Sequence, residues 1–183
     1  NNLEVSEILD IINNEDQKIS EKVAEILPNI EHLVLDIITN FNNGGRLFYV
    51  GCGTSGRLGV LDASECPPTF GVEDDLVQGI IAGGDRALRK SVENAEDSYN
   101  NGSYIIKKKQ INKFDTVIGI SASGGAPYVH GALNEAHVLG ATTALICCNQ
   151  VFDVKNIEHL LFVNVGPEVI TGSTRMKAGT ATK

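Results

Sequence analysis

Residues 47–71 of this chain, LFYVGCGTSGRLGVLDASECPPTFG, determine the fold that we expect. The apolar run Leu47–Val50 is typical of a buried strand. A loop rich in glycine and hydroxyl groups follows over 51–56, and a helical pattern begins after it. This succession places free backbone N–H groups and the positive end of a helix dipole at one point. The stretch therefore predicts an anion-binding site.

Further units of strand, loop and helix follow along the chain. We expect strands over 46–50, 76–82, 115–120, 142–148 and 160–164. We expect helices over 3–13, over 20–42 with a kink or a division at Pro28, from the first loop to a stop at Pro67-Pro68, over 85–97, within 98–112, over 127–139 and over 173–183. Such a succession predicts an α/β fold with one parallel sheet and helices on both faces.

A second loop of the same kind, Ser121-Ala122-Ser123-Gly124-Gly125, follows the third expected strand. Ligands of parallel sheets bind beyond the carboxyl ends of the strands, so both loops should lie at one site. Glycine and serine also end strands and cap helices, but two such loops at one edge favour anion binding over that explanation. The chain has neither Gly-Lys-Ser/Thr nor an intact G-x-G-x-x-G, so a dinucleotide site is not indicated.

A third hydroxyl cluster, Thr171–Lys177, precedes the last expected helix. Thr171 or Ser173 can cap that helix. Arg175 and Lys177 near its start oppose the dipole by roughly 0.3–1 kcal/mol each, which a bound anion would offset. A carboxylate such as Glu168 would serve equally well, and the sequence does not choose between the two.

Composition narrows the class of protein. The chain has 183 residues, enough for one domain, and a net charge of −8, which argues against nucleic acid or an anionic membrane as the main partner. The four cysteines and four histidines have no metal-ligand spacing, and the thiols are expected to be reduced, as in a cytosolic protein. No apolar run approaches the ~20 residues of a membrane span. The chain starts at Asn1 and stops within a helical pattern, so we expect both ends to be cut from a longer protein.

Two glutamates are candidates for acid–base chemistry. Glu65 ends the helix that the first loop begins, and Glu96 lies late in the expected helix over 85–97. A surface glutamate is ordinary on any helix. Asp62, Glu93, Asp97 and Glu168 compete for such a role, and spacing alone cannot choose among these carboxylates.

Three segments, 51–71, 80–97 (IIAGGDRALRKSVENAED) and 166–183 (GPEVITGSTRMKAGTATK), resemble the N-acetylmuramic acid 6-phosphate etherases. These enzymes belong to the sugar isomerase (SIS) superfamily and are related to the glucokinase regulatory proteins. The resemblance implies N-terminal helices over 1–43, packed on the domain or on a partner subunit. It also implies a SIS domain over 44–183, a flavodoxin-like three-layer sandwich with five parallel strands.

The resemblance also implies an activity. It is cleavage of the D-lactyl ether of N-acetylmuramic acid 6-phosphate to N-acetylglucosamine 6-phosphate and D-lactate, in peptidoglycan recycling. The protein would be a cytoplasmic homodimer that uses no metal and no cofactor. A phosphosugar-binding regulatory protein and an aldose–ketose isomerase on the same fold are the alternatives. Asp-Ala-Ser-Glu at 62–65 favours an enzyme.

Roles for single residues follow from the same resemblance. Glu65 in DASECPP matches the proton donor of the family, and Glu96 in VENAED matches its second active carboxylate. The residues expected to bind the sugar phosphate are Gly53, Thr54, Ser55, Gly56, Arg57, Ser121, Ser123, Gly124, Ser173, Thr174, Arg175 and Lys177. After Ser123-Gly124 the etherases commonly have Arg-Thr, whereas this chain has Gly125-Ala126, which removes a cation and a hydroxyl from the second loop.

Overall fold

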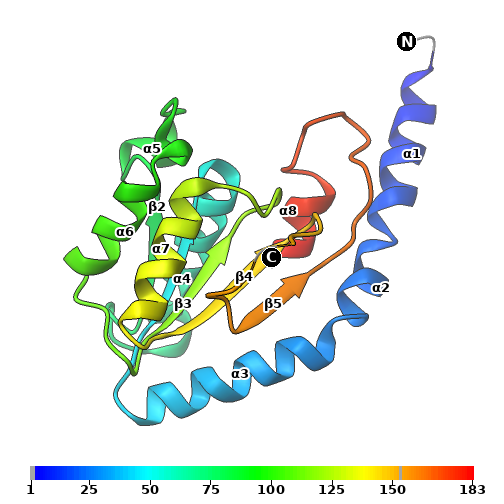
Figure 1. Cartoon of the computed structure of the whole chain (residues 1–183). Coiled ribbons are helices and arrows are strands. Elements are labelled where there is room, and N and C mark those ends of the chain that lie inside the picture. The colour runs from blue at the N-terminus through cyan, green and yellow to red at the C-terminus, as the bar shows by residue number, and fades with distance from the viewer. Residues whose placement is uncertain (1–2, 153) are drawn as a thin grey trace.

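The computed structural model describes residues 3–152 and 154–183, and a five-stranded parallel sheet forms its centre (Figure 1). The strands are β1 (Leu47–Gly51), β2 (Val77–Ile81), β3 (Thr116–Ile120), β4 (Thr142–Cys147) and β5 (His159–Phe162). Their order is β2-β1-β3-β4-β5, the flavodoxin-like order. The predicted α/β class and the five parallel strands are confirmed.

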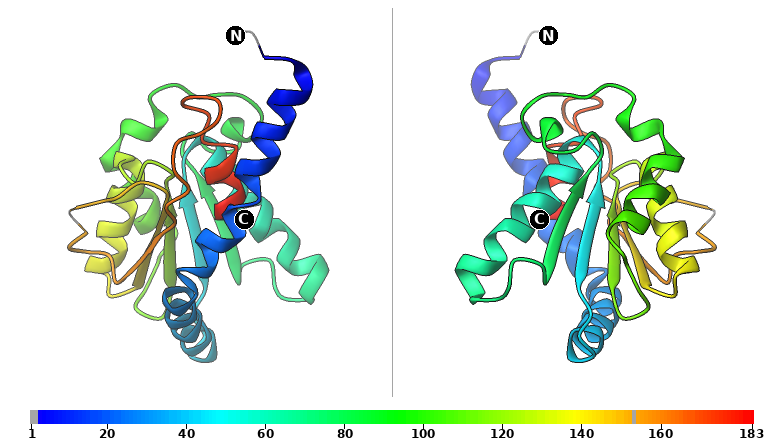
Figure 2. Two further views of the ribbon diagram at one scale, coloured as in Figure 1. Left: turned by 90° about the vertical axis from the view of Figure 1, so that its right-hand side faces the viewer. Right: turned by 90° about the vertical axis from the view of Figure 1, so that its left-hand side faces the viewer.

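Helices cover both faces of this sheet (Figures 1 and 2). They are α1 (Val5–Asp16), α2 (Ile19–Ala24), α3 (Leu27–Asn42), α4 (Gly53–Phe70), α5 (Arg86–Arg89), the 3₁₀ helix η1 (Ala95–Asp97), α6 (Tyr99–Lys108), α7 (Pro127–Val138) and α8 (Lys177–Thr182). Of these, α6 and α7 lie on one face, and α4, α8 and α3 on the other. The helix α1 projects from the body of the molecule (Figure 1).

Alternation along the strands divides the core between the two faces. Phe48 and Val50 of β1 pack towards α7 with Val117 of β3. Leu47 of β1 and Ile118 of β3 pack on the opposite face, near Ala63 of α4 and Leu33 of α3. Successive side chains of a strand point to opposite faces, so these apolar runs supply both layers at once.

Close contact between α6 and α7 depends on two glycines. A Cβ at Gly102 would lie 1.9 Å from the carbonyl oxygen of Tyr128, and one at Gly131 would lie 2.0 Å from that of Tyr99. No side chain fits at either position. The two helices therefore pack backbone to backbone, which fixes the start of α7 against the rest of the domain.

A buried ion pair holds the amino end of the sheet. Asp115, fully buried just before β3, accepts hydrogen bonds from the backbone N–H, Nε and Nη2 of Arg46 and from the backbone N–H and side-chain amide of Asn112. The carboxylate holds the pKa of Arg46 above its ordinary value, through hydrogen bonding first and charge second. Such hydrogen bonds and the opposite charge offset the desolvation cost of a buried carboxylate.

The expected stop of the first-loop helix at Pro67-Pro68 is wrong. Both prolines lie inside α4, which continues to Phe70. A proline removes an N–H and its ring crowds the carbonyl four residues before it, but its φ is helical, so α4 can accommodate both prolines in its last turn. Gly71 ends the helix in the left-handed conformation (φ 66°) and donates its N–H to the carbonyl of Pro67 at 2.8 Å.

The expected helix over 85–97 is also wrong. Only the short α5 forms, because Lys90 is extended (φ −135°, ψ 143°) and Asn94 is left-handed (φ 58°). Val92 instead packs on Gly83, where an added Cβ would lie 2.9 Å from the Cβ of Val92. This contact turns the chain back over the end of β2. Glu96 consequently lies in η1 and not late in a long helix.

Two expectations about the ends of the chain have different outcomes. Pro28 divides the pattern over 20–42 into α2 and α3, and it lies in the first turn of α3, where it needs no hydrogen bond. The last helix begins at Lys177 and not at Ser173, and neither Thr171 nor Ser173 caps it. Among the residues that the structure describes, no helix has the length and apolar character needed to cross a membrane.

Candidate functional site

The two predicted loops meet where the strand order reverses, between β1 and β3. Gly51, the last residue of β1, pairs with Ile120 of β3 on one side and Ile81 of β2 on the other. The chain leaves β1 towards α4 and leaves β3 towards α7. In open parallel sheets this switch point is where ligands bind. The prediction that both loops share one edge is confirmed by the strand pairing.

The first loop is shorter than expected because α4 begins at Gly53. Gly53, Thr54, Ser55 and Gly56 therefore form its first turn and not a loop. Cys52 occupies the N-cap position with an extended backbone, yet its side chain caps nothing, and the first turn holds no acidic residue. The uncapped N–H groups and the dipole of an 18-residue helix favour an anion there.

Hydrogen bonds shape the second loop tightly. The backbone N–H of Ser121 donates to Ile146, that of Gly124 donates to Ser121, and that of Cys148 donates to the carbonyl of Ala122. Ser121 is buried and Ser123 exposed, and their hydroxyl oxygens lie 3.4 Å apart. The first turn of α7 likewise contains no acidic residue and no side-chain cap. The first turn of α4 thus has several N–H groups without a side-chain partner, whereas at the start of α7 Pro127 has no N–H and the N–H of Val129 donates to the carbonyl of Ala126.

A cavity of about 440 Å³ lies beside the start of α4. It brings Gly53, Arg57 and Glu96 of the predicted site together. The other lining residues are Cys52, Ala82, Ala87, Ser91, Val92, Glu93, Asn94, Ala95 and Asp97. The guanidinium of Arg57 is held at the rim, because its Nε donates to the carbonyl of Leu88 at 3.2 Å.

The charged side chains that line this cavity are three carboxylates and one cation. Glu93, Glu96 and Asp97 line it with Arg57. Burial first, and the charges of Glu96 and Asp97 second, together raise the pKa of the Cys52 thiol to about 12. A thiol with this pKa stays protonated at neutral pH and is a poor nucleophile. Proton transfer by a carboxylate is the chemistry that the cavity can support.

Glu65 lies elsewhere. It is exposed on α4, at the edge of an apolar groove of about 450 Å³ between α3 and α4. Twelve residues separate it from Gly53, which at helical rise is about 18 Å. Within one chain, the structure does not bring Glu65 and Glu96 into one cavity.

The third hydroxyl cluster is arranged differently again. The carboxylate of Glu168 accepts the backbone N–H groups of Lys177 and Ala178, both at 3.0 Å, and so fills the start of α8. Lys177 is buried, and its ammonium donates to Glu15 of α1 at 2.6 Å. Ser173, Thr174 and Arg175 lie in the segment that leads to α8. The carboxylate alternative, with Glu168, is thus the one that the structure shows.

Sequence reasoning missed two groups that line the cavity, Cys52 and Asn94. Cys52 directly precedes the helix, a position where caps are expected. Asn94 adopts the left-handed backbone conformation, which asparagine tolerates better than most residues, so its residue type was the available signal. Over residues 3–152 and 154–183, no three His, Cys, Asp or Glu side chains are grouped so that they could hold a metal ion.

The fold and the switch-point site define an α/β domain of the sugar isomerase (SIS) class. The family described as the glucokinase regulatory protein N-terminal SIS domain matches residues 29–137. The chain belongs to this family. A phosphoheptose isomerase from Neisseria gonorrhoeae shares the fold, with a TM-score of 0.67 over 97% of this chain and 93% of that one at 17% identity.

Curated sequence relatives are much closer. N-acetylmuramic acid 6-phosphate etherase 2 of Vibrio parahaemolyticus is 52% identical over 182 residues, which cover 99% of this chain and 61% of the relative. The etherase of Staphylococcus epidermidis is 48% identical and is covered to 62%. The resemblance inferred from the sequence is confirmed. The chain spans about three-fifths of the length of these relatives.

Proposed function

We propose that this chain is part of an N-acetylmuramic acid 6-phosphate etherase, which cleaves the D-lactyl ether to give N-acetylglucosamine 6-phosphate and D-lactate. The observation that carries the proposal is the identity of about half of all residues with curated etherases over nearly the whole chain. The uncapped starts of α4 and α7 at one switch point support a phosphate-binding role. The proposed setting is cytoplasmic peptidoglycan recycling.

The proposed chemistry is an elimination followed by a hydration. In the open-chain aldehyde, the proton on C2 is acidic because the carbanion delocalises onto C1. Glu96 removes this proton, the bond from C3 to the lactyl oxygen breaks, and Glu65 protonates the leaving oxygen. Water then adds across the C2–C3 double bond, with its hydroxyl on C3 and its proton on C2. Each positioned carboxylate contributes about 10²–10⁴-fold.

We further propose that the two glutamates of one site come from two copies of the chain. Glu65 lies about 18 Å along α4 from the helix start, and it borders a different cavity from Glu96. A homodimer that sets the α4 side of one copy against the cavity of the other would unite them. Closed twofold dimers are the commonest oligomers.

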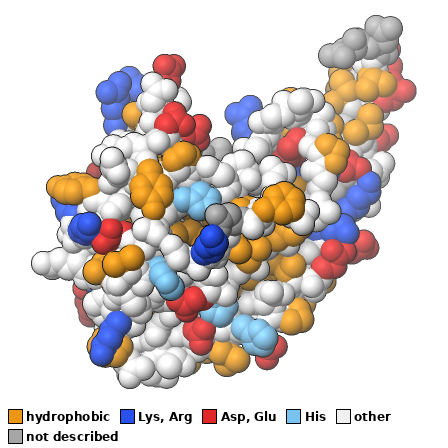
Figure 3. Space-filling view, viewed as in Figure 1, with side chains coloured by type: hydrophobic (Ala, Val, Ile, Leu, Met, Phe, Trp, Pro, Cys, Tyr) orange, Lys and Arg blue, Asp and Glu red, His pale blue; other side chains and the backbone are white. Residues whose placement is uncertain are grey.

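An unpartnered surface on α1 supports the homodimer. Val5, Ile8, Leu9 and Ile11 of α1, and Leu3 just before it, all have exposed side chains. Apolar side chains are visible along this projecting helix (Figure 3). Apolar surface of this extent on a soluble domain indicates an interaction site. A second copy is the occupant that we propose, because the shared site already sets a second copy against this one. We therefore propose, for the N-terminal region 1–43, that its helices pack on the domain or on a partner subunit.

The activity is tested with the full-length protein and N-acetylmuramic acid 6-phosphate, by assay of D-lactate. Release of D-lactate supports an etherase. Tight binding of the sugar phosphate without release of D-lactate would overturn that proposal and indicate a phosphosugar-binding regulatory protein. Isomerisation between C1 and C2 would indicate an aldose–ketose isomerase. The roles of the glutamates are tested by solvent deuterium exchange at C2. Loss of exchange in Glu65→Gln but not in Glu96→Gln would reverse the assignment.

Sharing of the site between copies is tested by mixing the Glu65→Gln and Glu96→Gln variants under conditions that exchange subunits. Half of the dimers are then mixed, and each mixed dimer has one complete site, so about a quarter of the wild-type activity should return. Glu65→Gln mixed with Glu65→Ala is the control and should stay inactive. No recovery in the first mixture, with subunit exchange verified, would contradict the shared site.

A further inference from the structure

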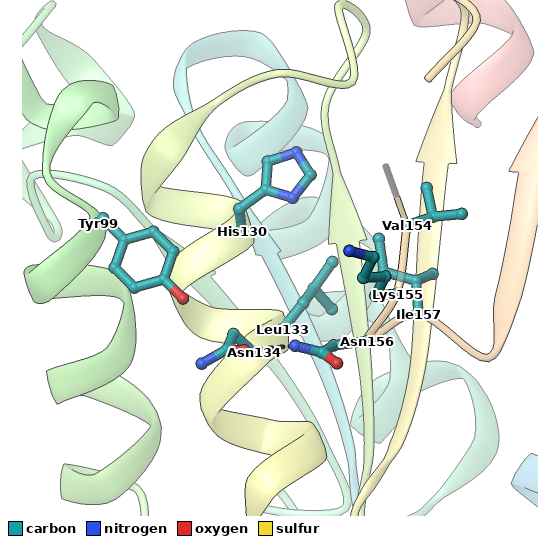
Figure 4. Close-up of a pocket in the computed structure, with 8 residues that line it drawn as sticks. All are labelled: Tyr99, His130, Leu133, Asn134, Val154, Lys155, Asn156 and Ile157. Carbon is teal, nitrogen blue, oxygen red and sulfur yellow. Dashed lines mark hydrogen bonds between the residues drawn. The ribbon is translucent and has the colours of Figure 1, made fainter. Parts of the chain in front are cut away.

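His130 of α7 makes a contact that the proposed mechanism does not use. Its Nε2 lies 2.7 Å from the carbonyl oxygen of Gly124, in the second loop. A carbonyl oxygen only accepts hydrogen bonds, so the ring donates from Nε2. Figure 4 shows the ring extending from the start of α7, above Leu133 and Asn134, at a pocket of about 220 Å³.

The same peptide unit is held at its other end. The N–H of Gly125 belongs to the peptide plane of the Gly124 carbonyl, and it donates to Oγ of Ser123 at 3.2 Å. In a planar trans peptide the C=O and N–H groups point in opposite directions. His130 and Ser123 therefore hydrogen-bond to the two opposite sides of one peptide group, and together they fix its orientation.

This peptide needs such a restraint because glycine flanks it on both sides. Gly124 has a φ of +73°, and a Cβ there would lie 2.3 Å from Cγ2 of Val151. A Cβ at Gly125 would meet only Oγ of Ser123, at 3.9 Å. Glycine populates several backbone regions with little penalty, so the flanking residues do not by themselves prevent the peptide from rotating.

The orientation decides what the hydroxyl of Ser123 can do. As the peptide lies, Oγ of Ser123 accepts from Gly125, and its own proton stays available for another acceptor. Oγ of Ser121 at 3.4 Å is one such acceptor, and the phosphate of a ligand at the switch point is another. If the peptide turned over, its carbonyl would face Ser123 and consume that proton. A carbonyl dipole would also face the anion.

We propose that His130 is a positioning residue of the anion site, which fixes the Gly124–Gly125 peptide so that Ser123 donates to the phosphate of the sugar. The inference rests on the proposed function, because it requires a sugar phosphate at this loop. His130 itself touches neither the sugar nor the reacting atoms. It acts through Gly124, Gly125 and Ser123 in turn.

The test compares His130→Leu, which removes the donor, with His130→Gln, whose side-chain amide can donate from a similar position. The affinity for N-acetylglucosamine 6-phosphate is measured by calorimetry on the full-length protein. Loss of one hydrogen bond of about 1–2 kcal/mol corresponds to an affinity about 5–30-fold weaker for His130→Leu. His130→Gln should retain most of the affinity. His137→Leu, two turns further along α7 and exposed, is the matched control and should bind as wild type.

A double-mutant cycle separates positioning from a general loss of structure. In a Ser123→Ala background the hydroxyl is gone, so His130→Leu should cost less further affinity than it does in the wild-type protein, whereas independent effects would add. Additive losses, or wild-type affinity in His130→Leu, would overturn the positioning role while leaving the proposed function intact. Failure of the wild-type protein to bind the sugar phosphate at all would overturn the proposed function, and this inference with it.

Discussion

The two ends of the central sheet are built in opposite ways. At the amino end, Asp115 accepts five hydrogen bonds from Arg46 and Asn112, and the amide of Asn40 donates to the hydroxyls of Thr116 and Thr142. At the carboxyl end, α4 and α7 start without side-chain caps. Polar groups at the amino end are partnered within the chain, whereas the first turn of α4 at the carboxyl end has no side-chain partner. Stability should therefore depend on the first end and ligand binding on the second.

The largest effect on this contrast should come from Asp115→Ala. Removal of the carboxylate leaves the Arg46 guanidinium and two backbone N–H groups without their acceptor at a buried position, which should cost about 3–5 kcal/mol. Urea unfolding of the variant, compared with the exposed Asp74→Ala as control, measures this loss. Affinity for N-acetylglucosamine 6-phosphate, measured where the variant is folded, should be unchanged. A weakened affinity there would mean that the two ends are coupled.

Ser121→Ala tests the opposite end. Its buried hydroxyl lies beside that of Ser123 at the switch point, so its removal should weaken sugar-phosphate binding about 5–30-fold. The free energy of unfolding should change far less than in Asp115→Ala. Calorimetry and urea unfolding give both numbers, with the exposed Ser20→Ala as control. Large destabilisation with unchanged affinity would refute the assignment of this edge to binding.

The sequence predicted most of the fold for a definite reason. Short apolar runs such as 116–120 are typical of parallel strands that are buried on both faces. Each of the five strands was predicted within a few residues of its observed bounds. The helix expected over 85–97 failed because its course is set by Val92 packing on Gly83, a contact between side chain and backbone that periodicity does not contain.

The site was predicted in part for a similar reason. Glycine and hydroxyl residues directly after strands predicted the two loops that meet at the switch point, since parallel strands share a carboxyl edge. The separation of Glu65 from Glu96 depends on the turn over 90–97 and on the length of α4, which continues through Pro67 and Pro68. His130 was missed because its partner is a backbone carbonyl, and no residue pattern marks such a bond.

Cys52→Ser supplies an acceptor within the chain to an N–H group at the carboxyl edge of the sheet, as Asp115 does at the amino edge. Cys52 already has the extended backbone of an N-cap (φ −121°, ψ 149°), so a serine hydroxyl there can accept an N–H of the first turn of α4. The variant should gain about 1 kcal/mol of stability. It should lose several-fold in affinity for inorganic phosphate and for the sugar phosphate, because one N–H group is then occupied. Thermal unfolding measures the gain in stability and calorimetry measures the loss of affinity, both on the same samples. A stabilised variant with unchanged affinity would show that the start of α4 is not part of the anion site.

The smallest effect concerns α8, whose start is already filled by Glu168 and whose Lys177 is paired with Glu15 of α1. Hydrogen bonds from Lys177 and Lys18 lower the pKa of Glu15 from 4.5 to about 2. A carboxylate with a lowered pKa in the folded state stabilises that state fully above the unfolded pKa, and this contribution fades as the pH falls from about 4.5 towards 2.

The Glu15→Gln variant should therefore lose less unfolding free energy than the wild-type protein as the pH falls through that window, whereas the exposed Glu21→Gln should behave as wild type. Because Glu15 is partly exposed and the amide oxygen of glutamine can still accept a hydrogen bond from the buried Lys177, the change should be the smallest of the four. An acid profile of Glu15→Gln that is indistinguishable from wild type would mean that the contact between α1 and α8 is not held by this charge, and that the start of α8 owes its closure to Glu168 alone.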